Sequence, residues 1–580
     1  MPRLDKPERL LLLLALIPCL WVSAEVFLAW AERLTYPYDL EWMEGGVLAH
    51  AWRVQHFKSL YVEPGPDFFP MIYPPGYPTV LAILGAIPGL SHPLGRLVSI
   101  CGTLASVAAL VYASRKHLDT PIWGLIAGGL YLGMYPRSGT FYDLVRPDGL
   151  HMGLLTWAVV QALDDDDKGA RRSGILLFLA FVVKHNAAWY GFPLALGVAA
   201  RGGLRRAALF TAWAAGLGLG FTVFMYAMTG GLFTTWLLDV PASHPIVYDR
   251  VIPGTVREVG HAMGLSLAVV CAWVLALGPR NAPRLPVPML IPAPLAAGAL
   301  STYVLNNMPA VSGIERPHFL EATAAYALIG VGVVWIPLVI VGMLQSRKIN
   351  GDLVMGVALY VFACVSTGLM RGHHGGFINV FMFLHWLTAA MMALALYDLT
   401  RHTPAIPGHA LAAVLAGAQA AQLGWRMDVD RLIPSEADRA AGDAIVEYLK
   451  TAEPPILSPF NPWLAAQAGH EPGWHLIALW DIRHPNGPFR EDVARIFRAI
   501  KEHHWGTIVD SDEGAELGYV NGYEKVKSFQ SNRTTMMPKV GWRARPNVIW
   551  TPRQGGARPA PPDDAPDPPE VEAPEPQDEP

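Results

Sequence analysis

Charged residues are scarce in this chain. Only 16% of its 580 residues are Asp, Glu, Lys or Arg, whereas a soluble protein of this size carries about 25%. The scarcity argues against an ordinary soluble enzyme, and the 52% of hydrophobic residues argues against a disordered chain. The net charge is only −4, so the composition indicates no nucleic-acid partner.

Cysteine is also rare. The four cysteines are Cys19, Cys101, Cys271 and Cys364, and all of them lie in apolar blocks rather than in polar loops. This placement excludes a disulfide framework and makes a cysteine zinc site a poor explanation of the fold.

Long apolar segments are the most prominent feature of the sequence. A helix needs about 20 mostly apolar residues to cross a bilayer. The hydropathy pattern therefore predicts about thirteen passes. They fall at 10–31, 94–114, 119–136, 147–163, 172–184, 187–200, 206–228, 260–278, 288–306, 322–344, 352–370, 377–397 and 407–425. A further apolar piece at 76–90 lies between prolines, and we expect it at the membrane interface.

The placement of Lys and Arg predicts the orientation. One alternate set of loops is short and rich in positive residues, and such loops stay in the cytoplasm. We read the first segment as an uncleaved signal anchor, with a cleaved signal peptide as the alternative. The N-terminus is then cytoplasmic, and an odd number of passes puts everything after residue 425 outside the cell (inner) membrane.

The C-terminal part has an ordinary soluble composition. Helices are predicted at 435–450 and 489–503, and short strands at 456–457, 506–509 and 547–550. This alternation predicts a small extracytoplasmic α/β domain over 426–552. Residues 553–580 are rich in Pro and acidic residues, so we expect a disordered tail. Residues 1–425 form the predicted all-α polytopic membrane bundle.

The first outer loop contains three carboxylates next to the membrane, Asp39, Glu41 and Glu44. If this stretch is helical, Glu41 and Glu44 share one face. A carboxylate here could deprotonate an acceptor hydroxyl or hold a divalent cation. The structural alternative is that Asp39 caps a helix and the glutamates are solvated. Tyr73 lies in the Tyr-Pro-Pro sequence that closes this loop.

Several cations fall in the outer loops or at the outer ends of spans. Arg146 and Asp148 open the span at 147–163, and Lys184 interrupts an apolar run. A guanidinium binds phosphate through two parallel N–H groups. The alternatives are a snorkelling arginine paired with Asp148 or Asp143, and a polar hinge at Lys184. The later outer loops add Arg316, His373, His374 and Asn379.

In these features the chain resembles the GT-C superfamily of membrane glycosyltransferases, near the bacterial aminoarabinose and protein mannosyltransferases. Four motifs carry the resemblance: the acids after the first span, the Tyr-Pro-Pro sequence, Arg146-Pro147-Asp148 and Lys184 between two short helices. It covers roughly residues 1–400. The resemblance implies a polyprenyl-phosphate-linked sugar donor and a lipid, glycan or protein acceptor on the outer face.

With this resemblance, roles are predicted for the singled-out residues. One of Asp39, Glu41 and Glu44 is the catalytic base, and Arg146, Lys184 and Arg316 bind the donor phosphate. Tyr73, Asp148, His373, His374 and Asn379 line the substrate site. The pattern fixes no cofactor, and a divalent cation (Mg or Mn) stays open. A transporter or flippase of lipid-linked glycans and a non-catalytic membrane scaffold are the competing interpretations.

Overall fold

The computed structural model describes residues 6–281, 351–373, 375–425, 427–511, 520, 522–529 and 534–553. The segments predicted at 288–306 and 322–344, the tail from residue 554, and the site candidates Arg316 and His374 lie outside these residues.

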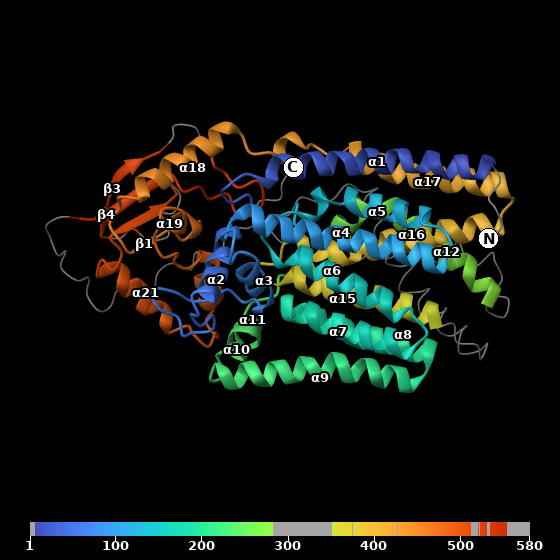
Figure 1. The fold of residues 1–580 in the computed structure, drawn as a ribbon, viewed down its shortest axis with the longest axis horizontal. Helices are drawn as coiled ribbons and strands as arrows, with labels where there is room; N and C mark the ends of the chain where they lie inside the picture. Colours follow the sequence, from blue (N-terminus) through green and yellow to red (C-terminus); the bar gives the residue numbers. More distant parts are fainter. Residues whose placement is uncertain are drawn as a thin grey trace, which may run out of the picture.

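The described chain is mostly helical, with a small sheet near its C-terminus, as the sequence predicts. Long helices run side by side in one bundle (Figure 1). They are α1 (Lys6–Leu34), α4 (His92–His117), α5 (Ile122–Gly133), α6 (Pro147–Ala162), α7 (Asp167–Val183), α8 (Gly191–Gly202), α9 (Leu204–Met228), α12 (Thr255–Asn281), α15 (Gly351–Gly372), α16 (Met382–His402) and α17 (Ala405–Trp425). Each apolar segment predicted within the described ranges coincides with one of these helices.

Among the described residues, five helical stretches are long and apolar enough to cross a membrane: Pro7–Leu34, His92–His117, Leu204–Met228, Val354–Gly372 and Ile378–His402. The chain is therefore a multi-pass membrane protein. The other bundle helices are shorter or less apolar, and pack between these.

Short helices cover one end of the bundle, between it and the C-terminal domain (Figure 1). They include α2 (Glu44–Gln55) and α3 (Gly76–Leu84) in the first loop, between α1 and α4, and α10 (Leu232–Thr234) and α11 (Val240–Ala242) after α9. Single turns at η1 (Pro136–Ser138), η2 (His185–Tyr190), η3 (Thr235–Asp239), η4 (Arg250–Gly254) and η6 (Ile378–Phe381) connect neighbouring helices.

Glycines bring α4 and α6 unusually close. A Cβ added at Gly102 would lie 2.3 Å from the carbonyl oxygen of Gly149, and one at Gly149 would lie 2.4 Å from that of Ser99. Small residues of this kind let membrane helices approach through their backbones. Ser99 Oγ also donates to the carbonyl of Arg146 at 3.1 Å. The close packing sets the start of α6 beside the first turns of α4.

The C-terminal domain is built on a four-stranded sheet in the order β1-β2-β4-β3. Its strands are β1 (Ile456–Leu457), β2 (Thr507–Asp510), β3 (Tyr523–Ser528) and β4 (Val548–Pro552), of which only β1 and β2 pair in parallel. Helices α18 (Glu436–Leu449), α19 (Trp463–Gln467), α20 (Leu476–Ile482) and α21 (Asp492–Lys501) complete it. The sequence predicts α18, α21, β1, β2 and β4, and it misses β3, α19 and α20.

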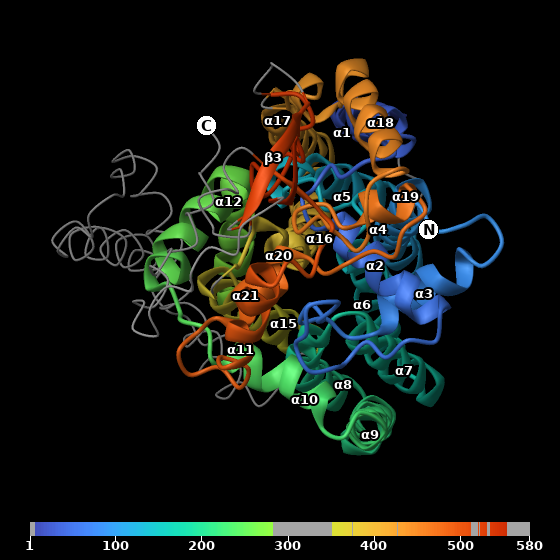
Figure 2. The same cartoon turned by 90° about the vertical axis from the view of Figure 1, so that its left-hand side faces the viewer.

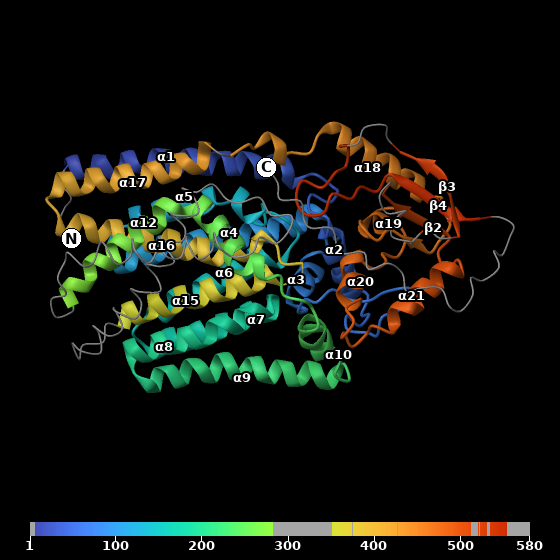
Figure 3. The ribbon, with the colours of Figure 1, turned by 180° about the vertical axis from the view of Figure 1, so that it is seen from behind.

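This domain sits directly on the first loop, as the views along the bundle axis and from behind show (Figures 2 and 3). The backbone N–H groups of Lys539 and Val540 both donate to the carbonyl of Leu40, at 2.8 and 3.2 Å. The indole of Trp42 packs against the rings of Trp480 and Trp542, with centroids 5.6 and 6.1 Å away. The first loop is therefore covered by residues from the far end of the chain.

Candidate active site

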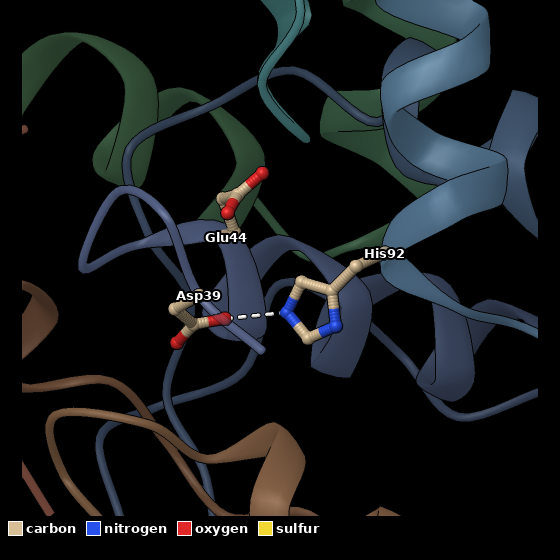
Figure 4. Close-up of side chains that lie close together, drawn as sticks. All are labelled: Asp39, Glu44 and His92. Carbon is tan, nitrogen blue, oxygen red and sulfur yellow. Dashed lines mark hydrogen bonds and ion pairs between the residues drawn. The ribbon is translucent and has the colours of Figure 1, made fainter. Parts of the chain in front are cut away.

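Asp39 lies in the turn between α1 and α2 and is bound from two distant elements. His92, at the start of α4, places Nε2 2.5 Å from Asp39 Oδ1 (Figure 4). Asn461 of the C-terminal domain donates its amide to Asp39 Oδ2 at 2.8 Å. Burial raises the pKa of the Asp39 carboxyl, although both partners oppose the rise. Asp39 thus ties the first loop to α4 and to the C-terminal domain.

Glu44 is a fully buried carboxylate whose two oxygens are both occupied. Arg96 donates to them at 3.1 and 2.8 Å, and the backbone N–H groups of Leu40 and Val145 donate at 2.6 and 2.7 Å. Burial would raise the pKa of this group, but the Arg96 charge outweighs it and the pKa falls to about 2. A carboxylate held in this way joins three segments and has no lone pair left for a substrate proton.

The Glu41 carboxylate is bound by fewer or longer hydrogen bonds than those of Asp39 and Glu44. It precedes α2, so it does not share a helix face with Glu44, as the helical interpretation requires. Its Oε2 accepts from Arg146 at 3.4 Å and from the backbone N–H of Met43 at 3.2 Å, and Oε1 accepts no hydrogen bond from the described residues. Burial, opposed by Arg146, raises the Glu41 pKa to about 8.

Arg146 is the residue before α6, and only 4% of it is exposed. Its guanidinium donates to the Tyr73 hydroxyl at 2.7 Å and lies over the rings of Tyr73 and Phe141, 5.3 Å from each centroid. Its Nε has no hydrogen-bond partner although it is buried. A guanidinium with one long ion-pair contact and an unused Nε–H retains capacity for an anion.

A second cation lies close by. Lys184 sits between the end of α7 and the turn η2, where the sequence predicts a break between two short helices. Its Nζ donates to Asp148 Oδ1 at 2.7 Å, and Asn379 donates to the same oxygen at 2.8 Å. The other oxygen, Asp148 Oδ2, is buried without a partner. Two cations and two acids thus meet where the first loop, α6, the end of α7 and η6 converge.

The remaining candidates lie apart or outside the described residues. His373 donates through Nε2 to the Pro241 carbonyl oxygen at 3.2 Å, and its ring centroid lies 4.8 Å from that of His244. It therefore borders α11 rather than the ion pairs. Arg316 and His374 lie outside the residues that the structure describes.

Sequence reasoning missed the partners that distinguish the three acids. His92, Arg96 and Asn461 come from α4 and the C-terminal domain, 53, 52 and 422 residues from the acids they bind. A signal existed for Arg96 alone: a charged residue within the apolar segment 94–114 is costly unless it is paired.

A divalent cation was left open by the sequence. Within the described ranges, one set of three or more candidate ligands has all its ligand atoms within 4.8 Å of one another: Asp39, Glu44 and His92. The Arg96 guanidinium already binds both Glu44 oxygens, and its charge would repel a metal ion at that position. These residues do not fit a divalent cation, and the mechanism proposed below uses none.

The fold and the site define a multi-pass membrane protein with buried acids and cations where its bundle meets its C-terminal domain. No family model matches the chain, and no curated protein matches its sequence. Among solved structures it is similar to ArnT from Cupriavidus metallidurans bound to undecaprenyl phosphate, with 12% identity, a TM-score of 0.46, and 91% of this chain and 97% of ArnT covered. It is also similar to ArnT from the same organism in the apo state, with 13% identity and a TM-score of 0.43. That match covers 91% of this chain and 96% of ArnT.

ArnT is a GT-C glycosyltransferase, the superfamily that the sequence motifs resemble. Identities and TM-scores this low carry no assignment of function, which depends on this chain's own site.

Proposed function

We propose that this protein is an integral-membrane glycosyltransferase. It moves a sugar from a polyprenyl-phosphate-linked donor to a lipid, glycan or protein acceptor on the extracytoplasmic face. The observation that supports this best is the pairing of a loosely held carboxylate, Glu41, with a buried guanidinium, Arg146, whose Nε has no partner. Comparing the glycolipids and glycoproteins of cells with and without the protein, by mass spectrometry, tests the proposal.

In the proposed reaction the donor phosphate binds Arg146 and Lys184. An acceptor hydroxyl attacks the anomeric carbon, the bond from that carbon to the phosphate oxygen breaks, and the configuration inverts. The polyprenyl phosphate leaves with the bonding electrons, and fixed cations stabilise its growing charge. The hydroxyl proton passes to Glu41. Phosphate binding also draws the guanidinium away from Glu41, which makes the carboxylate a stronger base.

Replacing Arg146 with alanine should lower transfer at least about tenfold, because a hydrogen bond to a charged group contributes roughly 1.5–3 kcal/mol. Arg146→Lys should recover only part of the rate, since an ammonium offers a point charge rather than two parallel donors. Transfer rates are measured in proteoliposomes.

The matched control is Arg53→Ala, because Arg53 lies in α2, donates to the Ser59 carbonyl and packs over the Phe68 ring rather than on the candidate acids. Normal transfer by the Arg146→Ala variant would contradict the role. Loss of the variant from the membrane would instead make Arg146 structural, as its burial allows.

The orientation is part of the proposal and has a separate test. We predict that a phosphatase fused at residue 552 is active outside the membrane, because the bundle places the C-terminal domain on the side of the long loops. The fusion also removes the tail, which we expect to be dispensable. An active cytoplasmic reporter at the same residue would overturn the orientation.

A further inference from the structure

The C-terminal domain contributes its own acid to the region of the site. Asp481 lies in the last turn of α20 and is 4% exposed. The preceding residue, Trp480, packs its ring on Trp42, the residue that follows Glu41. On the opposite side, Nε2 of His244 meets the Asp481 carbonyl at 2.8 Å. Asp481 is thus enclosed between the first loop and the segment around α11.

The Asp481 side chain makes almost no polar contacts with the described residues. It accepts no hydrogen bond from the described residues, and the nearest basic atom is Nε2 of His244, 3.9 Å from Oδ1. Burial alone raises the pKa of this carboxyl to about 8. A buried acid without donors costs stability. Such costs are typical of positions kept for a ligand.

Its surroundings point toward the proposed donor site. The Asp481 charge is close enough to raise the pKa of Tyr73, and the Tyr73 hydroxyl accepts from Arg146 at 2.7 Å. The His244 ring packs on His373, which begins the short stretch that ends at Asn379, a partner of Asp148. Asp481 therefore lies near Tyr73, the partner of Arg146, and its neighbour Trp480 packs on the residue that follows Glu41.

We propose that Asp481 binds hydroxyl groups of the donor's sugar, so that the C-terminal domain supplies a substrate-binding residue. The proposal rests on the proposed function, since it places the sugar next to a phosphate held by Arg146. A carboxylate can accept two hydrogen bonds from adjacent hydroxyls, and among the described residues no hydrogen-bond donor occupies the Asp481 carboxyl. The polyprenyl phosphate part of the donor does not contact Asp481.

The test compares two kinds of lipid on the purified full-length protein by native mass spectrometry. Undecaprenyl phosphate is one, and undecaprenyl phosphate carrying mannose, glucose or galactose is the other. Asp481→Asn should weaken binding of the preferred sugar-bearing lipid at least about tenfold and leave binding of undecaprenyl phosphate unchanged. The control Glu447→Gln, an exposed acid of α18, should change neither.

Thermal unfolding separates this role from a structural one. Removing an unpaired buried charge should leave the melting temperature of the Asp481→Asn variant unchanged or raise it. A lower melting temperature of the variant would overturn the inference. So would an equal loss of affinity for both kinds of lipid, or a wild-type protein that binds the lipids equally well with and without a sugar. A wild-type chain that fails to bind undecaprenyl phosphate would overturn the proposed function itself.

Discussion

Glu41→Gln is expected to lower sugar transfer by about 10²–10⁴-fold, the usual contribution of a general base. Glutamine keeps the shape of the side chain and its contact with Arg146 but cannot take a proton. Of the three acids in the first loop, Glu41 is the one with an oxygen that accepts no hydrogen bond from the described residues. Single-turnover transfer at saturating donor measures the effect.

The pH dependence gives a second measurement on the same group. Because burial raises the Glu41 pKa to about 8, the fraction of active carboxylate grows as the pH rises. Transfer by the wild type should therefore increase through about pH 8, and the residual rate of the glutamine variant should lose that rise. Glu63→Gln, an exposed acid of the same loop, is the control. If Glu41→Gln keeps the wild-type rate, the base is another group.

Glu44→Gln is expected to reduce the free energy of unfolding by about 3–5 kcal/mol, because it leaves Arg96 charged, buried and unpaired. The prediction follows from the five hydrogen bonds that Glu44 accepts, two of them from Arg96. Unfolding in detergent, followed against Glu63→Gln, measures it. The double variant Glu44→Gln/Arg96→Met should regain part of the stability, since no lone charge remains.

The pKa of Glu44 is shifted in the direction opposite to that of Glu41. The Glu44 pKa is about 2 in the folded chain against an ordinary 4.5. Its contribution to stability is therefore complete above about pH 4.5 and is lost as the pH falls toward 2. A glutamine variant as stable as the wild type at neutral pH would show that the Arg96 pair has no structural role.

The bundle could be predicted from the sequence because hydropathy is a local signal. Each apolar block needs only its own length and composition to identify a helix, and the break at Lys184 is visible in the same way. The proximity of Arg146, Asp148 and Lys184 could also be predicted, because the loops that carry them were placed on the same face of the membrane. Burial was not predictable in this way: Arg146, expected at the interface, is enclosed by Tyr73 and Phe141.

The separate roles of Asp39, Glu41 and Glu44 could not be predicted from the sequence, for a physical reason. In the chain they are near-equivalent carboxylates within six positions, and what distinguishes them is which distant donors reach each one. Those donors come from α4, α6 and the C-terminal domain. No spacing rule links Asn461 to Asp39, because only tertiary packing brings them together. Asp481 could not be identified from the sequence for the same reason.

The docking of Lys539 and Val540 on Leu40 has a consequence for how the protein is made. The ribosome delivers the first loop early, yet the backbone groups and the amide that complete it emerge only after almost the whole chain has been synthesised. Until then Asp39 lacks its Asn461 partner, and Trp42 lacks Trp480 and Trp542. A nascent chain therefore holds an unfinished first loop until these segments emerge. A chain cut short before residue 539 lacks both of the backbone donors that bind Leu40.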